Sequence, residues 1–344
     1  MDLKELQKTA QAMVQDGKGI LAMDESTPTC GKRLEGVGVE NTEDNRINYR
    51  TMLLGTPDLG KYISGAILYD ETIRQKTSDG TPFPDLMKQQ GIIAGIKVDT
   101  GAKDLAGHES EKVTEGLDGL RERLAEYVSF GAKFCKWRAV ITIDGNSLPS
   151  RACIESNAHA LARYAMLCQE ANLVPIVEPE VLINGNHSIE RCYSVTVETQ
   201  RTVFEQLYRQ GVAFSGIVLK PSMVISGTEA STRAPVDEVA DRTLECLSTT
   251  VPAAVPGIAF LSGGQSDEEA TAHLNAINIK AKERHSPWKL TFSYARALQH
   301  PALETWKGEP ANADEARKIL LQRARLNSLA STGSYQEKME AQAA

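Results

Sequence analysis

Short apolar segments recur along the chain and alternate with longer stretches in which apolar residues follow a helical spacing. Segments that are largely apolar on both faces are typical of strands in a parallel sheet, and the stretches between them predict covering helices. The helical spacing is clear at residues 116–131, 155–172, 189–211 and 266–278. The eight candidate strands are Gly19–Met23, Ile63–Tyr69, Gly91–Val98, Phe134–Val140, Val174–Val177, Gly216–Leu219, Ile258–Leu261 and Leu290–Tyr294.

Eight strand–helix units are the number that closes a (β/α)8 barrel. We therefore predict an α/β protein with a single barrel domain over residues 1–344. A doubly wound open sheet is the main alternative, because it also alternates strands with helices. That fold would place a G-x-G-x-x-G turn after its first strand, and residues 21–31 contain none. The pattern thus favours the barrel.

The two ends of the chain differ from this alternation. The residues after position 330, STGSYQEKMEAQAA, are small and polar, so residues 331–344 are predicted to form a flexible C-terminal tail. At the other end, a helical spacing of apolar residues predicts an extra N-terminal helix that stops near Gly17. Those apolar residues are Leu3, Leu6, Ala10, Met13 and Val14.

Composition narrows the possible functions. The chain has 344 residues and a formal net charge of −7, so the basic face that nucleic-acid binding needs is not expected. No apolar run approaches the roughly 20 residues of a membrane span, and the N-terminus lacks the apolar core of a signal peptide. Six cysteines without a C-x-x-C pair indicate reduced thiols. We expect a cytoplasmic protein, or alternatively a plastid stromal protein after removal of a transit peptide.

Charged residues stand at the ends of most candidate strands. The carboxyl ends of barrel strands carry the active site, so these side chains are expected to meet at one rim. Each alone has an ordinary explanation, such as a solvated strand end, a loop cap or a structural ion pair. A role in core packing does not explain the whole group, because clustered charges are costly unless they are paired or functional. The residues are Asp24, Lys97, Lys136, Arg138, Glu178, Glu180 and Lys220.

The last two candidate strands carry signals for phosphate binding. Ser262, Gly263 and Gly264 follow the seventh strand, and Ser293 and Arg296 lie at the end of the eighth. Loops after these two strands are the usual phosphate site of (β/α)8 barrels. Glycines there let backbone N–H groups approach an anion closely, and the start of the next helix adds its dipole.

Lys220 is the candidate nucleophile. It follows the apolar residues 217–219 and precedes Pro221, so its strand carries the amine toward the mouth of the barrel. A desolvated lysine with other cations nearby is a recognised nucleophile toward a carbonyl carbon. The six histidines form no H-x-x-x-H pair and none ends a candidate strand, so no metal site is predicted. These residues predict a metal-free Schiff-base lyase that acts on a phosphorylated ketose.

Several segments carry a resemblance to a known family. From about Leu3 to Tyr335, nearly its whole length, the chain resembles class I fructose-1,6-bisphosphate aldolases. The resemblance implies reversible cleavage of fructose 1,6-bisphosphate to dihydroxyacetone phosphate and glyceraldehyde 3-phosphate, in glycolysis, gluconeogenesis or the Calvin cycle. It also implies a homotetramer that needs no metal or other cofactor. The segments are GKGILAMDES, GIKVD, FCKWR, VPIVEPE, VLKPSMV, FLSGGQSDEEA, LNAIN and TFSYARAL.

The resemblance implies roles for the catalytic residues. Lys220 would form the Schiff base with the C2 carbonyl, and Glu178 would be the general acid and base for forming and dehydrating the carbinolamine. Asp24 would help to deprotonate the C4 hydroxyl during cleavage. Lys136 would stabilise charge near the nucleophile, and Glu180 would support the carboxylate network.

The resemblance also implies three groups of substrate-binding residues. The substrate would contact Lys97 and Arg138. The C1 phosphate would be held by the residues after the last two strands, Ser262, Gly263, Gly264, Ser293 and Arg296. The other phosphate would be reached by residues that follow the first strand, Thr29, Lys32 and Arg33.

The chain departs from the family at three places. Animal members end in a tyrosine that assists proton transfer, whereas this chain ends in Ala344 and its last tyrosine is Tyr335. Thr29 and Pro28 stand where serine and glycine are common, which keeps a hydroxyl but stiffens the loop. Ala295 replaces the glycine of SYGRAL, and a glycine lets the backbone approach phosphate closely. None of the three departures removes a catalytic group.

Two rival hypotheses were weighed against a bisphosphate aldolase. Another Schiff-base barrel, such as a transaldolase or a deoxyribose-phosphate aldolase, would have little use for Arg33 opposite Arg296. A non-catalytic scaffold would be free to lose Lys220, Glu178 and Asp24, all of which this chain retains. The residues therefore favour the bisphosphate aldolase.

Overall fold

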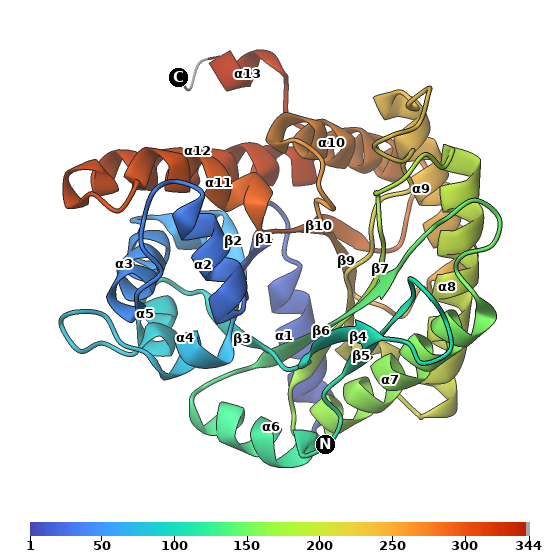
Figure 1. The fold of residues 1–344 in the computed structure, drawn as a ribbon, viewed down its shortest axis with the longest axis horizontal. Coiled ribbons are helices and arrows are strands. Elements are labelled where there is room, and N and C mark those ends of the chain that lie inside the picture. The colour runs from blue at the N-terminus through green and yellow to red at the C-terminus, as the bar shows by residue number, and fades with distance from the viewer. Residues whose placement is uncertain (342–344) are drawn as a thin grey trace.

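Eight parallel strands form a closed barrel at the centre of the molecule, and helices surround it (Figure 1). This computed structural model describes residues 1–341. Neighbouring strands follow the order β1, β10, β9, β8, β7, β6, β3 and β2, which confirms the predicted barrel and each of its eight strands. The barrel strands are β1 (Gly19–Ala22), β2 (Ile63–Leu68), β3 (Ile93–Lys97), β6 (Phe134–Ile141), β7 (Val174–Val181), β8 (Val218–Leu219), β9 (Gly257–Phe260) and β10 (Lys289–Tyr294).

At least one helix follows every barrel strand along the chain, as the alternating pattern predicts. The helices are α1 (Leu3–Met13), α2 (Thr27–Glu35), α3 (Glu43–Leu54), α4 (Asp70–Arg74), α5 (Phe83–Gln89), α6 (Leu120–Ser129), α7 (Arg151–Glu170), α8 (Ile189–Arg209), α9 (Val236–Thr250), α10 (Asp267–Glu283), α11 (Arg296–Trp306), α12 (Ala313–Ser331) and α13 (Lys338–Ala341). Single turns of 3-10 helix lie at Leu59–Lys61, Phe214–Gly216 and Pro310–Asn312.

The strands bury apolar side chains on both faces, which explains why they read as continuous apolar runs. Successive residues of a strand point to opposite faces, so every second residue enters the barrel and the others meet the helices. The interior core is separate from the larger core between the barrel and its helices. Fully buried residues of the interior core include Ile20, Ile67, Phe134, Ile176 and Val218.

Helix α1 closes the amino-terminal end of the barrel. Its Leu6, Ala10 and Met13 are fully buried and belong to the same core as the barrel interior. Gly257, the first residue of β9, makes room for this packing, because a Cβ there would lie 2.8 Å from Val14. The predicted extra N-terminal helix is therefore confirmed, and it seals the end of the barrel opposite the strand carboxyl ends.

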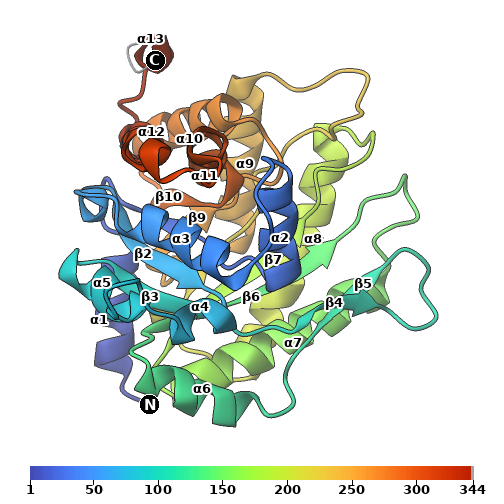
Figure 2. The ribbon, with the colours of Figure 1, turned by 60° about the vertical axis from the view of Figure 1, so that its left-hand side comes forward.

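A two-stranded antiparallel sheet of β4 (Gly101–Asp104) and β5 (Lys112–Glu115) lies beside the carboxyl-terminal half of β6 (Figure 2). The hydroxyl of Thr114 donates a 2.7 Å hydrogen bond to the backbone carbonyl of Arg138 in β6. The sequence analysis missed this hairpin. Most of its residues are polar and at least partly exposed, so it lacks the apolar pattern that marks the barrel strands.

The segment after α12 makes definite contacts as far as α13. Tyr335 is buried, and its hydroxyl donates to Glu340, which also pairs with Arg323 of α12 at 2.6 Å. These contacts tie α13 to α12. The flexibility predicted for residues 331–344 stays a prediction, and residues 342–344 lie outside the described part of the chain.

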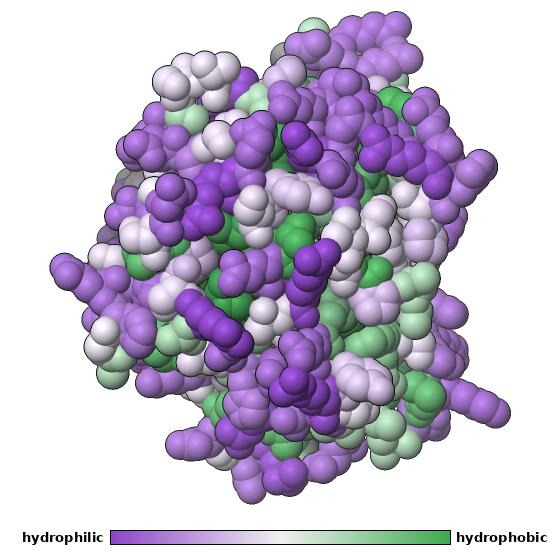
Figure 3. Space-filling model, turned by 90° about the vertical axis from the view of Figure 1, so that its right-hand side faces the viewer, coloured by the Kyte–Doolittle hydropathy of each residue, from purple (hydrophilic) through white to green (hydrophobic). Residues whose placement is uncertain are grey.

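The outer surface is mainly polar. Figure 3 shows one side of the molecule, where hydrophilic side chains surround smaller groups of hydrophobic ones. Within residues 1–341, no helix combines the length and apolar character needed to cross a membrane. All six cysteines are buried and none forms a disulfide.

We predict that a side chain at Gly95 in β3 would destabilise the fold because it would collide with Phe134. A Cβ at Gly95 would lie 2.1 Å from the ring of Phe134 on the neighbouring strand β6. Overpacking of this kind costs about 1–3 kcal/mol, so Gly95→Ala should lower the free energy of urea unfolding by about 2 kcal/mol. Adding Phe134→Leu should restore part of the loss, whereas an unchanged unfolding midpoint for Gly95→Ala would contradict this packing.

Candidate active site

A cavity of about 640 Å³ opens at the carboxyl-terminal end of the barrel. It brings together nearly all of the site residues predicted from the sequence. Lys32 is the exception, because it is exposed on α2 and does not line the cavity. The predicted residues that do line it are Asp24, Thr29, Arg33, Lys97, Lys136, Arg138, Glu178, Glu180, Lys220, Ser262, Gly263, Gly264, Ser293 and Arg296.

The alternation of strand residues explains why the charged side chains converge. Lys136 stands two residues after Phe134 in β6, and Glu178 stands two residues after Ile176 in β7. Phe134 and Ile176 are buried in the interior core. Because side chains two apart share a face, the same strands that fill the barrel below deliver charges to its mouth. Lys220, two residues after the buried Val218, follows the same rule.

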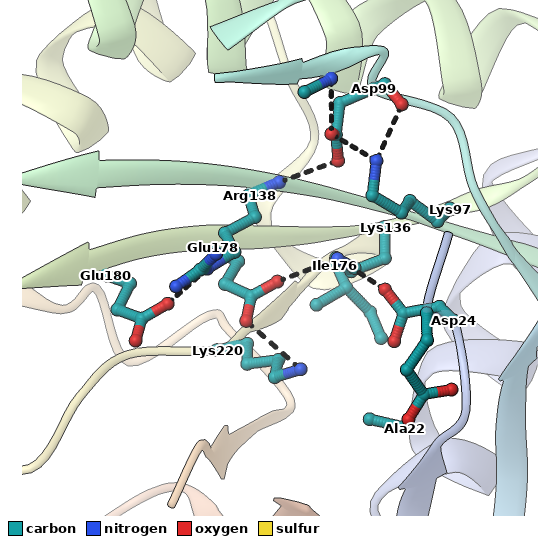
Figure 4. A network of polar contacts seen from close by, with 12 residues as sticks. Ala22, Asp24, Lys97, Asp99, Lys136, Arg138, Ile176, Glu178, Glu180 and Lys220 are labelled. Atoms are coloured by element: carbon teal, nitrogen blue, oxygen red, sulfur yellow. Dashed lines mark hydrogen bonds and ion pairs between the residues drawn. The ribbon is translucent and has the colours of Figure 1, made fainter. Parts of the chain in front are cut away.

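Lys136 lies between two carboxylates at the centre of the cavity (Figure 4). Its Nζ is 2.7 Å from Oδ2 of Asp24 and 3.4 Å from Oε2 of Glu178. On the other side, Nζ of Lys220 is 3.1 Å from Oε1 of Glu178. The side chains of Lys136, Glu178 and Lys220 are each at most 5% exposed. A single buried carboxylate therefore bridges the two lysines.

The ionisation of this cluster follows from its geometry. Burial alone would raise the pKa of Asp24, but the ammonium groups of Lys136, Lys220 and Lys97 outweigh burial and lower that pKa to about 2. Burial opposes the charge on Lys136, yet its neighbours Asp24 and Glu178 raise the pKa of Lys136 above its usual value. Asp24 and Lys136 are therefore a fixed anion and a fixed cation at neutral pH.

One oxygen of Glu178 is left free for chemistry. Lys136 lies 3.4 Å from Oε2, which is within ion-pair distance but outside hydrogen-bond geometry. Within residues 1–341, Oε2 consequently has no hydrogen-bond partner although it is buried. A buried carboxylate oxygen without a donor is costly unless a ligand supplies one. This oxygen is therefore free to accept a hydrogen bond from a bound molecule.

Two further ion pairs flank the cluster, and the sequence analysis missed one of the four residues, Asp99. Arg138 forms an ion pair with Glu180, and Lys97 forms one with Asp99. Asp99 also accepts hydrogen bonds from the backbone N–H groups of Gly101 at 3.1 Å and Arg138 at 3.2 Å. Asp99 thereby fixes Lys97 and ties β6 to the start of the hairpin. Its place directly after β3, in the segment GIKVD, was the signal that could have found it.

The loops after β9 and β10 form an anion-binding corner of the cavity. Gly263 and Gly264 have φ values of +59° and +97°, a left-handed conformation that favours glycine. A Cβ on Gly264 would lie 3.4 Å from the guanidinium of Arg296, the first residue of α11. The hydroxyl of Ser293 is buried and lacks a hydrogen-bond partner within the described part of the chain. An anion here would meet a hydroxyl, a guanidinium and the start of a helix.

Ala295 directly precedes Arg296 in this corner. Its φ is −103°, outside the left-handed region that favours glycine. The alanine that replaces the glycine of SYGRAL therefore does not have to adopt a left-handed conformation.

Another part of the cavity is built from α2 and the segment before it. Arg33 forms an ion pair with Glu25, whose side chain is 8% exposed. Thr29, one turn before Arg33, also lines the cavity, as does Tyr69 at the end of β2. The sequence analysis did not select Glu25 or Tyr69. Glu25 directly follows Asp24 in the segment DES, and only the fold shows that its side chain turns toward Arg33.

The described residues contain no cluster of three or more histidine, cysteine, aspartate or glutamate side chains that could hold a metal ion. The cavity instead offers two buried lysines that share one carboxylate, next to an anion-binding corner. On a (β/α)8 barrel this combination defines a lyase of the Schiff-base class.

Comparisons with known proteins identify the family. A sequence model described as fructose-bisphosphate aldolase class-I matches residues 5–344. A probable fructose-bisphosphate aldolase class 1 of Xanthomonas campestris is 58% identical over 336 residues, covering 97% of this chain and 99% of that protein. Fructose-bisphosphate aldolase 2, chloroplastic, of Arabidopsis thaliana is 49% identical over 340 residues, 99% of this chain and 84% of that protein.

A solved structure agrees with these sequences. The fructose-bisphosphate aldolase of Plasmodium falciparum, crystallised with TRAP and a small-molecule inhibitor, has a TM-score of 0.95 and 50% identity over 97% of this chain and 96% of its own. The chain belongs to the class I fructose-bisphosphate aldolases, a metal-independent Schiff-base family. It is an aldehyde-lyase that reversibly cleaves fructose 1,6-bisphosphate, which confirms the predicted family and reaction.

Asp24 should make stability depend on pH in the acid range. Its pKa drops from 3.8 to about 2 on folding, so its charge stabilises the fold above about pH 4 and this contribution is lost as the pH falls toward about 2. The urea midpoint of the wild type should exceed that of Asp24→Asn at about pH 6, and the gap should narrow at about pH 3.

Asp16→Asn is the matched control. Asp16 pairs with Lys289, but both side chains are more than half exposed, so the pair contributes little. The control should differ little from the wild type at either pH. A gap for Asp24→Asn that is equally large at about pH 6 and about pH 3 would contradict the assigned ionisation.

Proposed function

We propose that Lys220 is the lysine that forms the Schiff base with the C2 carbonyl of fructose 1,6-bisphosphate. The observation that carries this assignment is the 3.1 Å contact between Nζ of Lys220 and Glu178 inside the cavity. Lys136 is the other candidate, but two carboxylates face it and its pKa is raised, which keeps it protonated and non-nucleophilic. The difference in surroundings between the two lysines supports Lys220 as the nucleophile.

In the first half of the reaction, the neutral amine of Lys220 attacks C2, and one proton passes from its nitrogen to the former ketone oxygen to give a carbinolamine. Glu178 then gives a proton to the C2 hydroxyl, which leaves as water and produces the iminium ion. A carboxyl group can exchange both protons only if it reaches the reacting centre. Two observations on Glu178 support this role: its Oε1 lies 3.1 Å from Nζ of Lys220, and its buried Oε2 has no hydrogen-bond partner within residues 1–341.

In the second half, the C3–C4 bond breaks because the iminium accepts its electron pair. Asp24 helps to remove the proton from the C4 hydroxyl, glyceraldehyde 3-phosphate leaves, and an enamine remains on Lys220. Protonation at C3 and hydrolysis then release dihydroxyacetone phosphate and free the amine. Lys136 stays cationic 2.7 Å from Asp24, so it steadies the negative charge that accompanies both proton transfers.

We further propose that the two phosphate groups bind to different sets of residues in the cavity. The unpartnered Ser293 hydroxyl and the left-handed turn at Gly263 and Gly264 support a C1 phosphate site with Ser262 and Arg296. Arg33 and Thr29 on α2 support the site for the other phosphate. Lys97 and Arg138, held by Asp99 and Glu180, would bind the sugar between them.

The assembly and the location are proposed from the family. A homotetramer is the usual form of class I fructose-bisphosphate aldolases, and multi-angle light scattering of the full chain tests it. The bacterial relatives support a cytoplasmic location, while the chloroplastic relatives keep the plastid stroma as the alternative.

Lys220→Met should abolish turnover while leaving the fold intact. Loss of a covalent nucleophile removes the whole reaction path, so kcat for fructose 1,6-bisphosphate should fall by at least about 1000-fold. Lys133→Met, at an exposed position just before β6, is the control and should keep kcat within about twofold. A Lys220→Met enzyme with near-wild-type kcat would contradict the assignment.

Arg33→Ala should lower kcat/KM for the bisphosphate more than for the monophosphate, which distinguishes the two phosphate sites. A charge-assisted hydrogen bond to phosphate is worth roughly 1.5–3 kcal/mol, so kcat/KM for fructose 1,6-bisphosphate should drop by about 10- to 100-fold. Fructose 1-phosphate lacks the second phosphate and should lose much less. Lys32→Ala, outside the cavity on the same helix, should affect neither substrate strongly. Equal losses on both substrates for Arg33→Ala would exclude this site.

A further inference from the structure

Glu25 is a buried carboxylate at the edge of the cavity, and the reaction described above makes no use of it. Its side chain is 8% exposed and forms an ion pair with Arg33, whose side chain is 23% exposed. Within residues 1–341, Arg33 is the one cation that lies within ion-pair distance of Glu25. The charge of Glu25 is therefore balanced by the same guanidinium that faces the cavity.

Arg33 is held from a second side by a rigid group. Its guanidinium lies 3.4 Å from Oε1 of Gln299 on α11, which also accepts a 2.9 Å hydrogen bond from the hydroxyl of Tyr49. The amide nitrogen of Gln299 donates a 2.5 Å hydrogen bond to the carbonyl of Ala22 in β1. Gln299, Tyr49 and Ala22 are all at most 2% exposed. Arg33 is thus held by two buried groups, the neutral amide of Gln299 and the charged carboxylate of Glu25.

The other cation that acts on Glu25 is already engaged elsewhere. Arg50 on α3 pairs with Glu71 at 2.5 Å and donates to Gln75 at 2.7 Å. The negative charge of Asp24 disfavours a second negative charge on Glu25. The main groups that interact electrostatically with Glu25 lie in its own segment, in α2 and in α3, and are Asp24, Cys30, Arg33, Tyr49 and Arg50.

Glu25 is therefore poised to become neutral when it loses its partner. Burial raises the pKa of Glu25 above its ordinary value even with Arg33 in contact. A phosphate group that draws the guanidinium toward itself would weaken that contact and raise the pKa further. A carboxyl group left buried without a cation has a raised pKa, because burial penalises only its charged form.

We propose that Glu25 is a positioning residue that holds Arg33 in the ligand-free enzyme and takes up one proton from solvent when a substrate phosphate engages Arg33. This proposal rests on the assignment of Arg33 to the second phosphate. The proton neutralises Glu25 when the anionic phosphate binds. Arg33 then balances the charge of the phosphate instead of the charge of Glu25. Binding of the bisphosphate is then coupled to proton uptake, and its affinity increases as the pH falls through the range in which Glu25 is ionised in the free enzyme.

The test measures protons directly with ligands that cannot react. Fructose 1,6-bisphosphate and fructose 1-phosphate reduced at C2 give hexitol phosphates without a carbonyl, so no Schiff base forms. Isothermal titration calorimetry in two buffers of different ionisation enthalpy yields the protons taken up on binding. At about pH 8 a phosphate monoester is already a dianion, because its second pKa is about 6, and it contributes little.

For the wild-type enzyme, the hexitol bisphosphate should take up at least about half a proton more than the hexitol monophosphate. In Glu25→Gln this difference should vanish, because the amide does not titrate. Glu35→Gln is the matched control. Glu35 is the exposed last residue of α2, the helix that carries Arg33, and this variant should keep the wild-type difference. A purely structural role for Glu25 would alter stability without this change in proton count.

The outcomes separate this proposal from the one on which it rests. If the bisphosphate binds no more tightly than the monophosphate, the assignment of Arg33 fails and the role of Glu25 fails with it. If the bisphosphate binds more tightly but both ligands take up the same number of protons, only the Glu25 proposal is overturned. Undiminished uptake in Glu25→Gln overturns it as well. The comparison of the two ligands in the wild type holds even if the variant does not fold.

Discussion

The active site depends on the ammonium group of Lys136, whose side chain is 4% exposed and lies between Asp24 and Glu178. Without that cation, Asp24 would lose its ion-pair partner and Glu178 would keep only Lys220, which is costly in a low-dielectric interior. With it, Asp24 stays ionised and Glu178 can turn its other oxygen toward Lys220. The ammonium group of Lys136 in β6 therefore links Asp24, after β1, to Glu178 in β7.

The barrel wall makes this arrangement possible. Side chains two residues apart share a face of a strand, so the residues that fill the interior, such as Phe134 and Ile176, set the direction of Lys136 and Glu178 above them. The helices and α1 seal the sides and the opposite end, which leaves the mouth as the place where charges meet substrate. The same strands therefore supply both the apolar residues that pack the barrel interior and, two residues later, the charged residues of the site.

Sequence patterns predict the barrel strands and the charged residues at their ends because both follow from short-range periodicity, whereas Thr29, Lys32 and Arg33 were proposed only from the family resemblance. Apolar runs mark buried strands, and the residue that ends a strand of a barrel faces its mouth. The hairpin of β4 and β5 escaped prediction because it is polar and supported by β6 rather than by its own apolar face. Asp99 and Glu25 escaped because their importance lies in the cations they contact, Lys97 and Arg33, and such pairings appear only once the fold places distant segments together.

The measurement that tests the central claim most directly is borohydride trapping of the full-length enzyme with fructose 1,6-bisphosphate in excess EDTA, followed by mass mapping of the peptides. The account predicts a reduced adduct on the peptide that contains Lys220 and none on the peptide that contains Lys136. An adduct on Lys136, or no adduct together with activity that EDTA abolishes, would contradict it.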